Sequence, residues 1–146
     1  MKKLYLYLLT GILFWVVVDY TTAFNPDFRR WLSYMPDIWL YYIGYPILFS
    51  ILIYQFGLRR RKLLGAVLFM TLFMEIVLFH NTLLTTFPIL LIMIPIAFLI
   101  YGFITYMPYW IVEGTLKKNR VWVILFIFNW FVISVLSYAT TSRGMG

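Results

Sequence analysis

Glu75 is the residue of this chain most suited to chemistry, because it interrupts a long apolar run. The run LLGAVLFMTLFMEIVLFHNTLL covers residues 63–84 and is long enough to cross the hydrocarbon layer of a bilayer as a helix. An ionisable group at such a depth is costly, so it usually has a partner or a function. Helical spacing places Thr71 and Thr82 on the same face as Glu75. We therefore predict an intramembrane polar stripe, with Asn129 of the last apolar run as the hydrogen-bond partner of Glu75.

A second group of polar residues lies near one predicted surface. Asp19 ends the first apolar run, and His80 and Asn81 follow Glu75 toward the same side. The adjacent arginines of the intervening loop suit phosphate or carboxylate groups, which arginine binds through two parallel hydrogen bonds. These residues predict a local salt-bridged surface loop, with an outward-facing polar pocket as the alternative. The members of this predicted outer cluster are Asp19, Asp27, Arg29, Arg30, Asp37, His80 and Asn81.

Few reaction types are supported by the residue inventory. The chain has no cysteine and one histidine, which excludes disulfides, thiolate metal sites and cysteine nucleophiles, and we predict no metal or cofactor site. The motifs HExxH and GxSxG and the phosphate-binding loop of nucleotide hydrolases do not occur in the sequence. The candidates for catalysis are Glu75 as a general acid, with His80 and Asp19 beside it.

The composition is that of a membrane protein. Of the 146 residues, 64% are hydrophobic and 12% are charged, and the mean hydropathy is +0.90. An ordinary soluble domain is about 45–50% apolar and about 25% charged. A soluble fold of this size has too little interior for so much apolar surface, so lipid must cover it. We predict a single transmembrane domain over residues 1–146, located in the cell membrane.

Five apolar runs predict five spans, all helical, because a chain in lipid must pair its backbone groups internally. The fold class predicted is an all-α integral membrane protein, a five-span helical bundle. The turn signal at Asn25 and Pro26, followed by apolar residues at helical spacing, predicts a short amphipathic surface helix in the first outer loop. Pro108 is expected to break the fourth helix. The predicted spans are residues 4–18, 38–57, 63–84, 87–107 and 121–138.

The distribution of Lys and Arg predicts an N-in/C-out orientation, since nine lie on the side of the N-terminus and three on the other. The dense inner cluster of Arg59, Arg60, Arg61 and Lys62 predicts contact with anionic lipid headgroups. The first run, followed by residues 21–23, also resembles a cleaved signal, but it is long enough to span the membrane when tilted. The inner set is Lys2, Lys3, Arg59, Arg60, Arg61, Lys62, Lys117, Lys118 and Arg120, and the outer set is Arg29, Arg30 and Arg143.

Three function classes fit these features. The first is a non-enzymatic subunit or interaction protein of a membrane complex, a homo- or hetero-oligomer, because apolar and aromatic faces are abundant. The others are a membrane enzyme acting on a lipid or isoprenoid substrate, and an oligomeric channel or carrier. A cavity joining Glu75 to Asp19 or His80 would favour the enzyme over the subunit. Nucleic-acid binding is not predicted, because the net charge of +7 lies in short clusters beside apolar runs.

Overall fold

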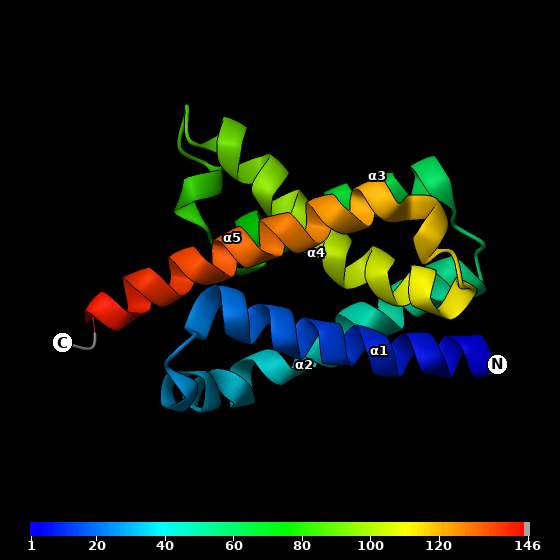
Figure 1. Ribbon diagram of the computed structural model, residues 1–146, viewed down its shortest axis with the longest axis horizontal. Helices are drawn as coiled ribbons and strands as arrows, with labels where there is room; N and C mark the ends of the chain where they lie inside the picture. Colours follow the sequence, from blue (N-terminus) through cyan, green and yellow to red (C-terminus); the bar gives the residue numbers. More distant parts are fainter. Residues whose placement is uncertain (145–146) are drawn as a thin grey trace.

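The computed structural model describes residues 1–144, and all of its elements are helices (Figure 1). Five α-helices run back and forth along the long axis, so that the N- and C-termini lie at opposite ends. The side chains of Arg60 and Arg143 lie outside the described residues, and so do their predicted roles. The elements are α1 (Lys2–Asp19), the π-helix η1 (Tyr20–Phe24), α2 (Phe28–Tyr54), α3 (Arg60–Leu72), the π-helix η2 (Phe73–Leu78), the 3₁₀-helix η3 (Thr82–Leu84), α4 (Leu90–Glu113), the 3₁₀-helix η4 (Leu116–Asn119) and α5 (Arg120–Gly144).

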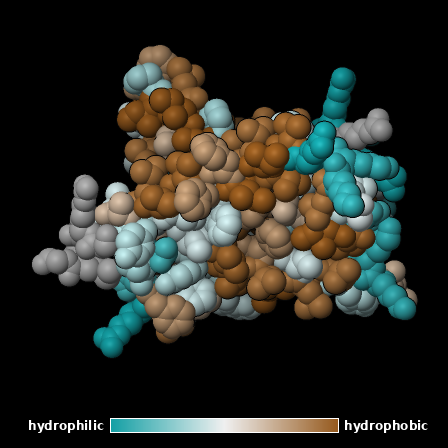
Figure 2. Space-filling view, viewed as in Figure 1, coloured by the Kyte–Doolittle hydropathy of each residue, from teal (hydrophilic) through white to brown (hydrophobic). Residues whose placement is uncertain are grey.

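The all-helical prediction is confirmed, and four helical segments are long and apolar enough to cross a membrane. Figure 2 shows hydrophobic residues over the middle of the visible face and hydrophilic residues gathered toward its ends. The segment α3–η2 is not among the four, because it begins with basic residues, carries Glu75 and ends at Leu78. The four segments are Lys2–Phe24, Phe28–Tyr54, Leu90–Glu113 and Leu116–Thr141.

Helix α1 packs against α2 and α4 along one face. Its buried side chains include Tyr7, Trp15 and Val18. Gly11 allows a close approach to α2, because a Cβ atom at this position would lie 3.1 Å from the Cβ of Pro46. Close packing of α1 brings Trp15 and its neighbour Asp19 against the other helices.

The prediction of a separate surface helix in the first outer loop is wrong. The residues concerned form the first turns of α2, which continues through Pro36. The side chain of Asp27 starts this helix by accepting a hydrogen bond from the backbone N–H of Arg30 at 2.9 Å. A proline inside a helix removes one hydrogen bond. The buried indole of Trp31, which donates to the hydroxyl of Tyr42 at 3.0 Å, compensates by tying the early turns to the rest of α2.

The predicted break at Pro108 is also wrong. Helix α4 begins at Leu90, continues through both Pro95 and Pro108, and ends at Glu113. Pro108 is buried among the helices, so its missing N–H is offset by packing. Gly114 ends the helix instead, with a φ of 66° in the left-handed conformation that glycine adopts without strain.

The helix observed at the third predicted span ends earlier than predicted, before residue 84. The α-helix gives way to the π-helix η2, and His80 then adopts a φ of 50°, which ends the helical path. A positive φ is uncommon for a residue other than glycine. Thr82 therefore starts the separate helix η3 and does not share a helical face with Glu75. Thr71 is buried and donates to the carbonyl of Val67 in its own helix at 2.8 Å. The predicted polar stripe therefore does not extend to Thr82.

Candidate functional site

The structure brings Asp19 and Glu75 to the same cavity, here called the acidic cavity. It has a volume of ≈ 310 Å³ and lies between α1, η1, α2, η2 and α4. Of the residues that the structure describes around it, none is Lys, Arg or His. The side chains of the two acids are near enough for their charges to interact. The lining residues are Trp15, Val18, Asp19, Thr22, Ala23, Phe24, Ile38, Tyr41, Tyr42, Glu75, Phe79, Ile100, Tyr101 and Ile104.

Asp19 is fixed in place by α2. Its Oδ2 accepts a hydrogen bond from the hydroxyl of Tyr42 at 2.5 Å, and that hydroxyl accepts one from the indole N–H of Trp31 at 3.0 Å. Both aromatic side chains are buried, whereas Asp19 is partly buried. These two hydrogen bonds hold the carboxylate of Asp19 at the cavity and leave its other oxygen available to a ligand.

Glu75 is held from two directions. Its Oε2 accepts from the side-chain amide of Asn81 at 2.8 Å, and its Oε1 accepts from the hydroxyl of Tyr101 at 3.0 Å. Asn129, the partner expected from the sequence, instead donates to the backbone carbonyl of Ile96 at 3.3 Å. The difference arises because the bend at His80 folds Asn81 back toward η2, which places an amide beside the acid.

Trp15 lies between the hydrogen-bonding partners of the two acids. Its ring centroid is 5.9 Å from that of Tyr42 and 5.7 Å from that of Tyr101, the latter in an edge-to-face arrangement. The indole is 4% exposed, and its N–H has no hydrogen-bond partner within the described chain. A buried donor without a partner is unusual in a folded protein. Trp15 therefore lines the cavity with an aromatic wall, while its N–H is buried without a partner among the described residues.

Both acids are next to π-helical segments. Asp19 is the residue directly before η1, and Glu75 lies inside η2. A π-helical turn shifts the side chains that follow it relative to an α-helix, and such turns occur often at functional sites. Here they change the helical phase on both sides of the acidic cavity. The helical spacing assumed from the sequence around Glu75 does not hold through η2.

The predicted outer cluster is divided by the structure. Asp19 lines the acidic cavity and Asn81 binds Glu75, but His80 is exposed and absent from the lining. The guanidinium of Arg30 lies over the rings of Phe24 and Tyr34, at 6.0 and 5.9 Å from their centroids.

The remaining members of that cluster do not form the predicted salt-bridged loop, so this prediction is wrong for the described side chains. Asp27 caps α2, while Arg29 and Asp37 are exposed on it. Among the described side chains the one salt bridge joins Lys3 and Glu113 at the other end of the bundle. No set of three or more His, Cys, Asp or Glu residues gathers into a metal-binding group within the described part.

Sequence reasoning missed the aromatic half of the site, namely Trp15, Trp31, Tyr42 and Tyr101. A usable signal was present, because a tyrosine in the middle of an apolar run must find a partner for its hydroxyl. Which partner it finds depends on how the helices pack.

No protein-family profile, curated protein or solved structure matches this chain. The site must therefore be interpreted from its own chemistry.

Proposed function

We propose that this chain is a multi-pass membrane protein that binds a cationic ligand in the acidic cavity, as a carrier or as a binding subunit of a membrane complex. The observation that carries the proposal is the presence of two carboxylates, Asp19 and Glu75, on one cavity without a basic side chain. Two carboxylates that share a site repel one another, and a cation between them relieves that repulsion.

The walls of the acidic cavity support the same ligand class. Trp15, Tyr41 and Tyr101 present aromatic rings to it, and a cation over such rings gains about 2 kcal/mol when it is desolvated. The apolar lining suits the organic part of an alkyl- or arylammonium compound better than a fully hydrated metal ion. The proposed ligand is therefore an organic cation with apolar substituents.

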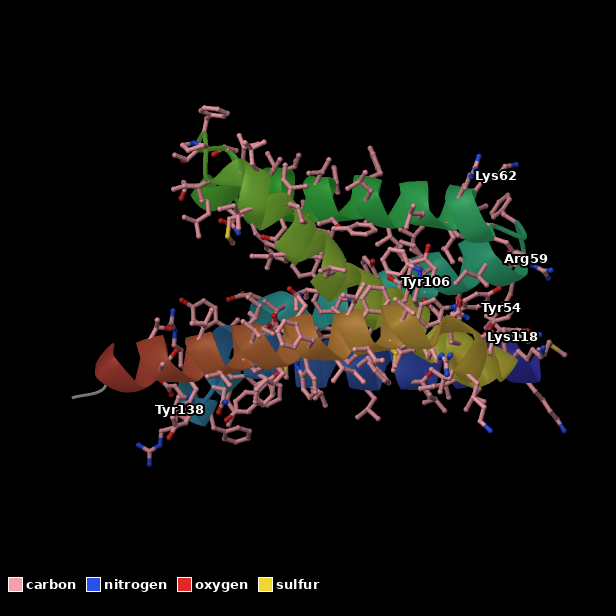
Figure 3. All side chains as sticks on the ribbon, turned by 45° about the horizontal axis from the view of Figure 1, so that its top comes forward. Tyr54, Arg59, Lys62, Tyr106, Lys118 and Tyr138 are labelled. Atoms are coloured by element: carbon pink, nitrogen blue, oxygen red, sulfur yellow. The ribbon has the colours of Figure 1, made fainter. Side chains whose placement is uncertain are left out.

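The distribution of charge supports five spans with the N-terminus inside. Figure 3 shows Arg59, Lys62 and Lys118 at one end of the molecule and Tyr138 at the other. The termini also lie at opposite ends, as an odd number of crossings requires. On this proposal α3 and η2 together form a short third crossing, and the acidic cavity is near the outer surface of the cell membrane.

Single cysteines in this cysteine-free chain test the orientation. We expect an impermeant thiol reagent to label Ser33→Cys and Thr86→Cys on intact cells, because both positions lie at the proposed outer end and are exposed. Lys62→Cys and Lys117→Cys should react only after lysis. Labelling of either lysine position on intact cells contradicts the proposed orientation.

Ligand binding is tested with two ions of equal shape and opposite charge. Tetraphenylphosphonium and tetraphenylborate are titrated into the protein in non-ionic detergent, and tryptophan fluorescence is followed. We expect the cation to bind, and Asp19→Asn or Glu75→Gln to weaken its binding about tenfold each, as for loss of a charged hydrogen-bonding group. Asp37→Asn is the matched control, because Asp37 is an exposed acid of α2 outside the cavity.

Two results would contradict the proposal. Equal affinity for the two ions would mean that they partition into the apolar surface. An Asp37→Asn variant as weak as the cavity variants would mean that overall charge decides binding. The acidic cavity joins Glu75 to Asp19, which is also the geometry expected of a membrane enzyme. If the Gln variant at Glu75 keeps cation binding but loses turnover of a lipid substrate, a membrane enzyme with Glu75 as general acid becomes the better assignment.

A subunit role is favoured by a separate observation on α5. Ile124, Phe128 and Phe131 are 63%, 65% and 62% exposed and recur at a spacing of three and four residues, with Val121 and Val135 continuing the row. Such a row suits packing against a partner helix or lipid. Mass photometry in detergent tests it: a defined oligomer that Phe128→Ala and Phe131→Ala dissociate supports a helix partner, and a monomer supports lipid.

A further inference from the structure

A second cavity lies at the end of the bundle that holds the N-terminus. It has a volume of ≈ 530 Å³ and is here called the basic cavity. Arg59 and Arg61 reach it from the start of α3, and Lys118 reaches it from η4 just before α5. These residues are far apart in the sequence, so the cavity exists only because α3 and α5 both begin at this end (Figure 3).

Within the described side chains, the three cations have no acidic partner. Glu113 is the acid nearest to η4 in the sequence, and its Oε2 is 2.9 Å from the Nζ of Lys3. No acid is among the described residues that line the basic cavity. Arg59, Arg61 and Lys118 are all exposed.

The floor of the basic cavity is apolar and rigid. Phe126 is 1% exposed, and its ring lies 5.8 Å from that of Trp110 and 6.2 Å from that of Tyr106, stacked in both cases. Trp122 extends the same surface outward, with its ring 5.9 Å from that of Phe126. A ligand that fits must therefore combine an anionic group with an apolar body.

We infer that the basic cavity binds the phosphate headgroup of an anionic lipid. Arg59 and Arg61 provide planar donors that match phosphate oxygens, and Lys118 adds a third positive charge from the opposite wall. The acyl chain would lie on Leu64 and Trp122, toward the proposed hydrocarbon region. Basic cavities between membrane helices are suited to such headgroups. The inference rests on the proposed membrane insertion, but not on cation binding at the acidic cavity.

The assignment is more specific than general attraction of basic residues to a membrane. General attraction depends on the total charge at this end, so any three cations would contribute alike. A binding site depends on the three that line it. Lys2, Lys62 and Lys117 belong to the same end but not to the lining, and so provide a matched control.

The full chain is purified in non-ionic detergent, and the binding of phosphatidic acid and phosphatidylcholine is measured by native mass spectrometry. We expect phosphatidic acid to bind selectively. The combined change Arg59→Gln, Arg61→Gln, Lys118→Gln should weaken its binding on the order of a hundredfold, at about fivefold for each charge. The control Lys2→Gln, Lys62→Gln, Lys117→Gln should change it about twofold or less, as for exposed charges outside a site.

A competition measurement distinguishes a lipid from a soluble phosphate compound, and a single variant replaces the triple variant if that variant misfolds. Inorganic diphosphate should not displace the lipid, because it cannot use the aromatic floor. Displacement at equal concentration would assign the cavity to a soluble phosphate compound and overturn the lipid inference, as would equal losses in the two triple variants. If the first triple variant does not fold, Lys118→Gln alone replaces it, with an expected loss of about fivefold. Unchanged lipid binding in that variant also overturns the inference.

Discussion

The acidic and basic cavities have similar aromatic walls but hold their charged groups in different ways. Asp19 and Glu75 are partly buried, and each accepts a hydrogen bond from a tyrosine hydroxyl. Arg59 and Lys118 are exposed, and within the described side chains they form no ion pair. Groups fixed by hydrogen bonds select a ligand by position as well as charge. Long exposed side chains select mainly by charge and adapt to the ligand.

The largest effect on ligand binding is expected when the charged groups of one cavity are removed. One variant removes those of the acidic cavity, and a separate variant removes those of the basic cavity. Asp19→Asn combined with Glu75→Gln should weaken tetraphenylphosphonium binding on the order of a hundredfold, because two charged hydrogen-bonding groups are lost. Phosphatidic acid binding should stay unchanged in this variant. Removal of the three cations of the basic cavity should weaken phosphatidic acid binding and leave tetraphenylphosphonium binding unchanged. Loss of both ligands in both variants would show that the cavities are not independent sites.

A side chain at Gly102 is expected to have the next largest effect, because it would collide with Phe126. A Cβ atom here would be 2.9 Å from the Cε1 of Phe126, in the floor of the basic cavity. Gly102→Val should lower the free energy of unfolding by about 1–3 kcal/mol through overpacking. Denaturation in detergent, followed by circular dichroism, measures this change. Gly65→Val is the control, since no atom would lie within 4 Å of its Cβ, and equal losses would contradict the packing argument.

A smaller effect is expected at the hydrogen bond that fixes Asp19. Tyr42→Phe removes the hydroxyl shared by Asp19 and Trp31 and should cost about 1 kcal/mol of stability, together with a loss of cation binding. Tyr41→Phe is the comparison, because Tyr41 lines the same cavity and its hydroxyl makes no hydrogen bond within the described structure. Unfolding curves and cation titrations of the two variants decide the matter. Similar values for both would remove the argument for a fixed carboxylate.

The smallest effect is expected at the Lys3–Glu113 salt bridge, which ties the start of α1 to the end of α4 at 2.9 Å. The side chain of Lys3 is 60% exposed, so Lys3→Ala should change stability by about 0.5 kcal/mol or less. Lys2→Ala provides the reference for removal of one charge at this end. A large loss that is specific to Lys3, and that persists in high salt, would mean that this pair organises the basic end.

Helix content and the location of charge follow from the sequence alone. Apolar runs of membrane length favour helices whatever their neighbours are, because each helix pairs its own backbone groups. That Glu75 is a candidate functional residue also follows from the sequence, since an acid inside an apolar run is costly wherever the run packs. Element boundaries were predicted less well. Pro108 lies inside a helix because its burial among the other helices offsets the hydrogen bond that the proline removes.

The sequence by itself determined that this chain forms apolar helices with basic residues concentrated at one end and an acid at Glu75. Only the tertiary structure decided what that acid contacts. The hydrogen bonds of Glu75 with Asn81 and Tyr101 depend on the backbone bend at His80 and on the packing of α4. Neither the bend nor the packing is marked by a periodic pattern in the local sequence. The π-helix η2, which contains Glu75, shifts the helical phase, so the face predicted from α-helical spacing does not continue to Thr82. A cavity is formed by helices that are distant in sequence, and its residues are therefore set by packing.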